Sequence, residues 1–252
     1  MEEKIIKKAP QANGYMQIEL KDFTVGSYRK NEAYKTLGTN LMFCGSDKKV
    51  IAFTSCLPAE GKSTTVMHLA RALTEIGKRV LVIDADMRCS MAAARYGVSG
   101  VQYGLSQLLS GQVEKKDAIC QTQFPDFHII FAGYYPPNPV ELLDSERFRS
   151  FVAEVREEYD YVLIDTPPVV QIVDAVVIAK CCDGAILVIA KGVDGVRQVK
   201  ACKQQIERTG CPVLGVVLNS LNHRKIYGKK KKDYYYDKCK NCDCDEKPSV
   251  SA

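Results

Sequence analysis

The segment SCLPAEGKSTT, residues Ser55–Thr65, has the residue types and spacing of a phosphate-binding loop. It lies between a short apolar run and a stretch with helical spacing, so it would connect a strand to the start of a helix. Gly61 would let the backbone approach an anion, and the N–H groups at the helix start would point at that anion. Lys62 would bring positive charge to the β- and γ-phosphates of a nucleotide, and Ser63 would offer its hydroxyl to Mg²⁺. The residues expected to contact the nucleotide in this loop are Ala59, Glu60, Gly61, Lys62, Ser63 and Thr64.

Carboxylates follow two apolar runs elsewhere in the chain. VLVIDADMR carries Asp84 and Asp86, and YVLIDTPP carries Asp165. Each aspartate alone could begin a turn, but ligands of open α/β sheets bind where the strands end. Carboxylate oxygens suit Mg²⁺, which keeps several waters and is held by few protein groups. We therefore expect these three side chains beside the phosphate-binding loop. Arg88, which follows them, could contact phosphate or a neighbouring subunit, or form an exposed salt bridge.

Apolar strands alternate with helical segments along the chain, which predicts an α/β fold. The strands are nearly continuous in Val, Ile and Leu, as is typical of a mainly parallel sheet with helices on both faces. Together with the phosphate-binding loop, this pattern predicts a P-loop NTPase fold. The expected strands are 49–55, 80–84, 127–133, 161–165, 184–190 and 213–219, and the expected helices are 62–77, 145–159, 174–182 and 195–209.

The chain has 252 residues, which fits one large domain with a tail. We expect an N-terminal extension over residues 1–27, a single domain over residues 28–222 and a flexible basic tail rich in Tyr and Cys over residues 223–252. The formal net charge is +5, and residues 224–252 hold nine Lys/Arg and five Asp/Glu, so the tail carries +4 and the rest +1. This distribution argues against a nucleic-acid-binding protein. The chain start has no signal-peptide pattern and the eleven cysteines have no framework spacing, so we expect a cytoplasmic protein.

The chain resembles the bacterial tyrosine kinases over roughly residues 28–238. The resemblance is carried by the loop with Lys62, the D-x-D-x-R pattern that begins at Asp84 and the D-x-x-P pattern that begins at Asp165. The segment YYPPNPVELLDSERF, residues 134–148, and the tyrosine cluster near the end also look like that family. The resemblance implies a non-specific protein-tyrosine kinase that uses ATP and Mg²⁺ and regulates the synthesis and export of capsular polysaccharide or exopolysaccharide.

The same resemblance implies roles for individual residues. Lys62 and the loop backbone would hold the phosphates, while Ser63, Asp84 and Asp165 would hold Mg²⁺. Asp86 would orient the acceptor hydroxyl and take its proton. In the wider P-loop superclass an Asn at the end of the last strand contacts adenine, so Asn219 is expected to contact the nucleotide; an Asn that only forms a turn is the alternative. The expected autophosphorylation sites are Tyr227, Tyr234, Tyr235 and Tyr236.

The resemblance also implies partners. A membrane-anchored activator of the polysaccharide co-polymerase type would recruit the protein to the inner face of the membrane. The segment Ser27–Phe43 looks like the family's assembly helix, and a homo-oligomer would allow phosphorylation between subunits. Glu32 fits the E-x-x-R-x-x-R pattern of that helix, whereas Lys35 and Gly38 depart from it. No residue identifies a further protein substrate.

Two other functions are compatible with the phosphate-binding loop. A ParA/MinD-like ATPase would act as a nucleotide-dependent switch, but that group has a lysine where this chain has Leu57. A nucleotide-binding scaffold without transfer activity has the same motifs as a kinase, so only an assay separates these two.

Overall fold

The structure is a computed structural model that describes residues 14–21, 23, 28–170, 172–192 and 195–219. The predicted tail and its four tyrosines lie outside these residues. The strands are β1 (Met16–Gln17), β2 (Val50–Ser55), β3 (Val80–Asp84), β4 (Cys120–Gln121), β5 (Phe127–Ile130), β6 (Tyr161–Asp165), β7 (Gly184–Ala190) and β8 (Val213–Asn219). The helices are α1 (Tyr28–Phe43), α2 (Lys62–Thr74), α3 (Ala92–Arg95), α4 (Leu105–Leu109), α5 (Lys115–Ala118), α6 (Pro139–Leu143), α7 (Glu146–Glu158), α8 (Asp174–Ala179) and α9 (Val196–Glu207).

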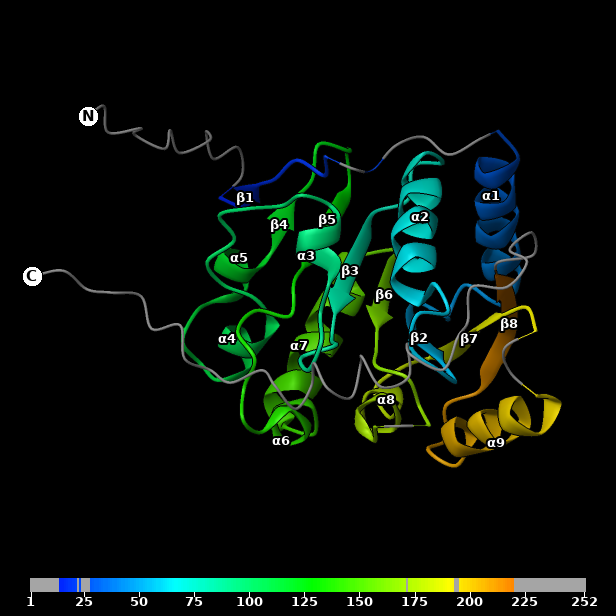
Figure 1. The fold of residues 1–252 in the computed structure, drawn as a ribbon. Coiled ribbons are helices and arrows are strands. Elements are labelled where there is room, and N and C mark those ends of the chain that lie inside the picture. Colours follow the sequence, from blue (N-terminus) through cyan, green and yellow to red (C-terminus); the bar gives the residue numbers. More distant parts are fainter. Residues whose placement is uncertain (1–13, 22, 24–27, 171, 193–194, 220–252) are drawn as a thin grey trace, which may run out of the picture.

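The described strands form one sheet in the order β1-β4-β5-β3-β6-β2-β7-β8 (Figure 1). Every neighbouring pair is parallel except β4 and β5, which are antiparallel. The α/β class and the mainly parallel sheet are therefore confirmed. The strand that precedes the phosphate-binding loop, β2, lies between β6 and β7, near the middle of the sheet.

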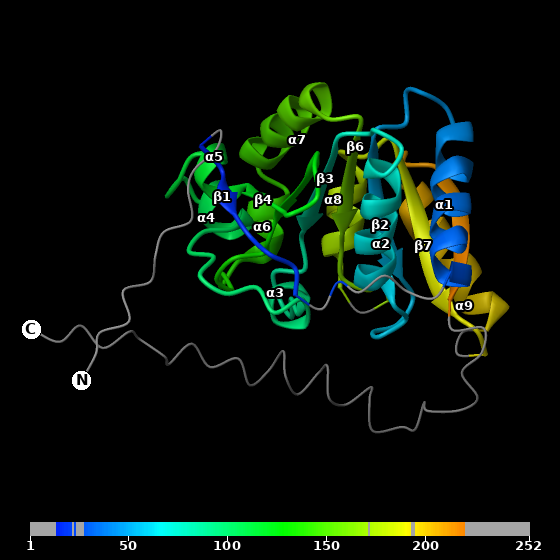
Figure 2. The ribbon, with the colours of Figure 1, turned by 90° about the horizontal axis from the view of Figure 1, so that it is seen from above.

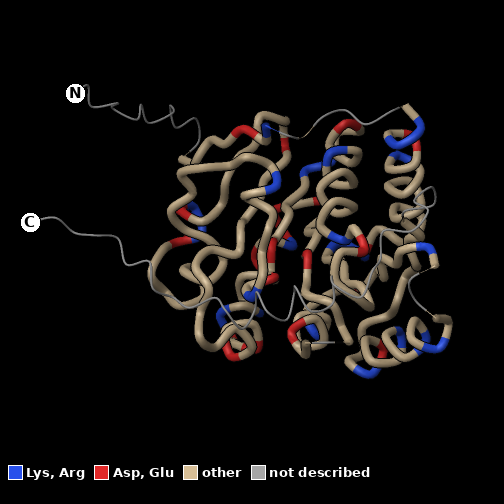
Figure 3. The backbone as a smooth tube through the Cα atoms, viewed as in Figure 1, with Lys and Arg blue, Asp and Glu red and all other residues tan. Residues whose placement is uncertain are grey.

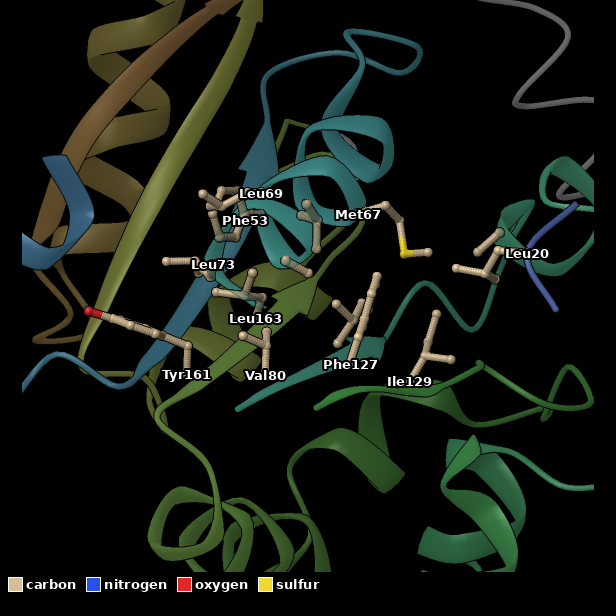
Figure 4. Close-up of a cluster of buried hydrophobic side chains, with 14 of the residues drawn as sticks. Leu20, Phe53, Met67, Leu69, Leu73, Val80, Phe127, Ile129, Tyr161 and Leu163 are labelled. Atoms are coloured by element: carbon tan, nitrogen blue, oxygen red, sulfur yellow. The ribbon is translucent and has the colours of Figure 1, made fainter. Parts of the chain in front are cut away.

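Helices cover both faces of the sheet, which explains why its central strands are apolar throughout (Figures 1 and 2). On one face, Ile51 and Phe53 of β2 pack with buried residues of α1 and α2. Figure 4 shows part of this cluster, where Leu69 and Leu73 of α2 lie over the strands. On the other face, the strands pack against α7, α8 and α9. This double cover fixes the strand ends, and with them the residues that follow.

Helix α1 packs against α2. Gly38 of α1 is buried against that helix, because a Cβ atom placed on it would lie 3.3 Å from Leu73 Cδ2. A glycine inside a helix is unfavourable by roughly 1 kcal/mol relative to alanine. Close helix packing offsets that penalty here and gives a physical reason for glycine at this position. Glu32 and Lys35 form an exposed ion pair on the same helix, with Nζ and Oε1 3.3 Å apart.

The residues before α1 also join the domain. β1 pairs with β4, and Leu20 and Phe23 are buried in the same cluster as α2. Figure 4 shows Leu20 beside Met67 and Ile129 at the edge of this cluster. Among the described residues, no helix is long and apolar enough to cross a membrane.

Candidate functional site

The order of the strands gathers the predicted site residues at one edge of the sheet. The neighbours β3 and β6 are paired in register, so Asp84 lies directly opposite Asp165. On its other side β6 pairs with β2, whose last residue Ser55 begins the phosphate-binding loop. Acidic and basic positions accordingly meet near the start of α2 in the middle of the molecule (Figure 3).

A cavity of about 500 Å³ opens at this edge of the sheet. All six predicted loop residues and all three predicted aspartates line it. Asn219 is not among the lining residues, although it contacts the loop. The described lining residues are Ser55, Pro58, Ala59, Glu60, Gly61, Lys62, Ser63, Thr64, Asp84, Asp86, Cys89, Ser90, Met91, Ala92, Arg95, Asp165 and Pro168.

The loop has a backbone shape that favours glycine at its end. Gly61 has φ 89° and ψ 18°, in the left-handed region, and caps α2. A Cβ atom on Gly61 would lie 1.9 Å from Asn219 Nδ2, which leaves no room for a side chain. The first hydrogen bond of the helix runs from Thr65 N–H to the Gly61 carbonyl. The N–H groups of Lys62, Ser63 and Thr64 come before this bond, so they are available to bind an anion.

Lys62 and Asp165 form a buried ion pair at the centre of the cavity. Lys62 Nζ donates to Asp165 Oδ1 at 2.5 Å, and the two side chains are only 9% and 6% exposed. Burial alone would lower the pKa of Lys62, but Asp165, Asp86 and Asp84 together raise it above its ordinary value. The lysine therefore carries its positive charge at the place where phosphates would bind.

Asp84 is a carboxylate with a strongly raised pKa. Burial, and then the neighbouring charges of Asp165 and Asp86, raise its pKa from 3.8 to about 7. Ser90 Oγ donates to Asp84 Oδ2, and Asp86 N–H donates to Oδ1 at 3.2 Å. Asp86 is held in turn by N–H groups of the following loop, since Oδ1 accepts from Cys89 at 3.0 Å. A cation beside these carboxylates would favour their charged forms.

The oxygen atoms of Ser63, Asp84 and Asp165 fit the preference of Mg²⁺ for hard ligands. They face one cavity with the phosphate-binding loop, which is where Mg²⁺ would also take oxygen ligands from a nucleotide. Across the described part of the chain, no group of three or more His, Cys, Asp or Glu side chains forms a ready-made metal site. Mg²⁺ keeps several waters and needs few protein ligands, so these oxygen atoms would be enough to hold it beside a nucleotide.

The carboxylate of Glu60 points into the protein rather than toward a ligand. Its Oε2 accepts from Leu57 N–H at 2.8 Å, and its Oε1 accepts from Ala190 N–H at 2.9 Å. Asn219 Nδ2 donates to the Glu60 carbonyl at 2.9 Å. The loop is thus joined to the ends of β7 and β8, a support that the sequence motif does not reveal.

Arg88 forms a salt bridge with a buried partner rather than an exposed one. Its Nε and Nη2 donate to Asp174 Oδ2 and Oδ1 at 2.9 and 3.0 Å. Asp174 is the first residue of α8 and is 0% exposed, so the guanidinium of Arg88 gives this buried carboxylate a partner. The contact links the loop after Asp86 to α8. In the sequence, Asp174 has the position of an ordinary residue at the start of a helix, and nothing near it in the chain indicates that Arg88 is its partner.

Comparisons with known proteins identify the family of the chain. Residues 48–212 match a family described as an AAA domain. The chain is 38% identical over 207 residues to the tyrosine-protein kinase CpsD of Streptococcus agalactiae serotype III (strain NEM316), covering 82% of this chain and 89% of that protein. The kinase domain of the Escherichia coli tyrosine kinase ETK superposes with a TM-score of 0.72 at 31% identity, covering 79% of each chain.

The septum site-determining protein MinD from Pyrococcus horikoshii OT3, solved in complex with Mg-ADP, is a more distant match. Its TM-score is 0.62 at 25% identity, covering 74% of this chain and 76% of that chain. The fold is therefore shared with MinD, whereas sequence identity and TM-score are both higher for the kinases. The chain belongs to the bacterial tyrosine-protein kinases, which confirms the predicted family.

Proposed function

We propose that this protein uses ATP and Mg²⁺ to phosphorylate tyrosines, including Tyr227 and Tyr234–Tyr236 of its own C-terminal segment. The observation that carries the proposal is the shared cavity of the phosphate-binding loop and the aspartates at the ends of β3 and β6. Phosphoryl transfer depends mainly on positioning and on charge stabilisation, and this cavity contains groups for both.

Each residue has a defined task in this proposal. Lys62 and the N–H groups at the start of α2 bind the phosphates. Ser63, Asp84 and Asp165 hold Mg²⁺, which neutralises phosphate charge when bound. Asp86 orients the acceptor hydroxyl and accepts its proton. A base promotes the reaction because the pKa of free tyrosine is near 10, so its hydroxyl keeps its proton at neutral pH.

Asn219 is proposed to act on the nucleotide through the loop that it contacts. Its Nδ2 lies close to Gly61 and donates to the carbonyl of Glu60, so it fixes the turn that precedes Lys62. Glu60 belongs to the nucleotide site in the same way, through the shape that its carboxylate gives the loop.

The biological setting follows from family membership. The protein would regulate the synthesis and export of capsular polysaccharide or exopolysaccharide from the cytoplasm. A membrane-anchored activator would recruit it to the membrane, and a homo-oligomer would let one subunit phosphorylate the tail of another. Each added phosphate brings about −1.5 to −2 charge, so several would reverse the positive charge of the tail and weaken contacts that depend on it.

Mass spectrometry after incubation of the purified full chain with ATP and Mg²⁺ tests the proposal. We expect phosphate on Tyr234–Tyr236 that is lost in Lys62→Met and kept in Lys200→Met, an exposed lysine of α9. Circular dichroism checks that Lys62→Met, which leaves Asp165 without its ion-pair partner, is folded.

The same reaction is run with and without the cytoplasmic segment of the activator. ATP hydrolysis without phosphotyrosine in both cases would favour the switch ATPase. Nucleotide binding without any turnover would favour the scaffold. Phosphotyrosine that persists in folded Lys62→Met would show that the site has been assigned wrongly.

A further inference from the structure

Arg95 brings a positive charge to the cavity from an element that the known motifs do not include. It is the last residue of the short helix α3, and it lines the cavity together with Ala92 and Met91 of the same segment. Its Nη1 donates to Thr64 Oγ1 at 2.7 Å. Thr64 is the third residue of α2, so the guanidinium lies against the end of the helix that receives phosphates.

Arg95 differs from the other two basic groups near this site in the kind of partner that its side chain has among the described residues. Lys62 is paired with Asp165, and Arg88 is held by both oxygens of Asp174. No ion pair joins Arg95 to a carboxylate within the described ranges, where its side-chain hydrogen bond goes to a neutral hydroxyl. None of these residues neutralises its positive charge. Arg95 is exposed at the side of a cavity that would bind a highly charged anion.

We propose that Arg95 binds the inner phosphates of the nucleotide, beside Thr64. This inference rests on the proposed function and adds a phosphate-binding residue to it. Lys62 serves the β- and γ-phosphates and Ser63 serves the metal, whereas the loop backbone and helix start cradle the α- and β-phosphates. A guanidinium has five N–H donors, so it can keep Thr64 with one nitrogen and offer others to phosphate oxygens.

The inference predicts which ligands lose affinity when Arg95 is changed. A hydrogen bond to a charged group typically changes affinity by about tenfold to a hundredfold. In Arg95→Gln, we expect ADP and a non-hydrolysable ATP analogue to lose affinity by similar factors in this range, because both contain the inner phosphates. Arg95→Lys keeps the charge but not the planar fork, so it should recover part of the loss.

Isothermal titration calorimetry on the full chain measures these affinities in the presence of Mg²⁺. Arg197→Gln is the matched control, because it removes the same charge from an exposed position on α9, away from the cavity lining. The control should bind both nucleotides like the unmodified protein. Thermal unfolding without nucleotide shows whether Arg95→Gln alters the fold itself, and we expect a change no larger than that of the control.

The outcomes separate this inference from the proposed function. Equal affinities for the unmodified protein and Arg95→Gln would overturn the inference while leaving the kinase proposal intact. A loss confined to the ATP analogue would overturn the placement at the inner phosphates, because it would put Arg95 on the γ-phosphate. If the unmodified protein bound neither nucleotide, both proposals would fail.

Discussion

Replacing Glu60 by glutamine tests whether the phosphate-binding loop depends on a buried carboxylate. Glu60 is 1% exposed, and its two oxygens accept hydrogen bonds from Leu57 N–H inside the loop and Ala190 N–H at the end of β7. Glutamine has the same shape but only one oxygen, and its other terminal group is a donor. One of the two backbone N–H groups would then face an NH₂ group instead of an oxygen.

The expected loss of stability follows from these two bonds. A hydrogen bond to a charged group contributes about 1.5–3 kcal/mol, and a buried donor left without a partner costs about 1–3 kcal/mol. One bond is lost in Glu60→Gln and the other changes from charged to neutral, so we expect the free energy of unfolding to fall by about 2–4 kcal/mol. For a domain of this size, that corresponds to a decrease of roughly 5–15 °C in Tm.

Urea unfolding without nucleotide measures the effect, with Glu75→Gln as the control. Glu75 forms an exposed ion pair with Arg71 on the surface of α2, and such pairs contribute little. Calorimetry of nucleotide binding then shows whether the loop keeps its shape, and we expect weaker binding in Glu60→Gln. A Glu60→Gln protein as stable as Glu75→Gln would refute the reasoning, since the carboxylate would then contribute nothing that an amide cannot.

Three further changes test other parts of the site. Gly61→Ala should abolish nucleotide binding in calorimetry, because φ is 89° and the new Cβ would lie 1.9 Å from Asn219 Nδ2; normal binding would show that the loop adapts. Arg88→Gln should lower the free energy of unfolding in urea by about 3–5 kcal/mol, because the charge of Asp174 would be left buried without its partner; a change below about 1 kcal/mol would contradict this. The pKa of Asp84 is raised from 3.8 to about 7 in the folded protein. Between these pH values the folded state binds a proton that the unfolded state has lost, so the free energy of unfolding should fall as pH rises through this range. Urea unfolding at several pH values measures this dependence. In Asp84→Asn the free energy of unfolding should fall less steeply with pH, and an equally steep fall would show that Asp84 does not cause it.

The central strands and the meeting of the site residues could be predicted from the sequence. β3 and β6 begin and end at the predicted residues, because runs of Val, Ile and Leu stop where a carboxylate follows. Parallel strands place their carboxyl ends at the same edge of the sheet, so Asp84 and Asp165 had to lie near the loop that follows β2. Residue types and a simple geometrical rule were sufficient for this part of the site.

The supports of the site could not be predicted, because they join residues far apart in the chain. Glu60 and Ala190 are 130 positions apart, and Arg88 and Asp174 are 86 apart. A motif records only local spacing, so it shows Glu60 as one more loop residue and Asp174 as a helix start. Helix α3 has four residues, too few for a periodic pattern, and Arg95 at its end therefore carried no signal in the sequence.

The balance of charge in the cavity favours a nucleotide that arrives together with a cation. Three buried aspartates face the loop, and the single charge of Lys62, which is paired with Asp165, cannot balance all three. Without further positive charge, these carboxylates would repel the phosphates that the loop is shaped to bind. The pKa of Asp84 is raised mainly by burial, and the charges of Asp165 and Asp86 raise it further by the same kind of repulsion. A divalent cation held by Asp84 and Asp165 would remove that repulsion and would leave Lys62 to pair with phosphate instead of Asp165. Arg95, outside this network of carboxylates, can attract the nucleotide before that exchange takes place.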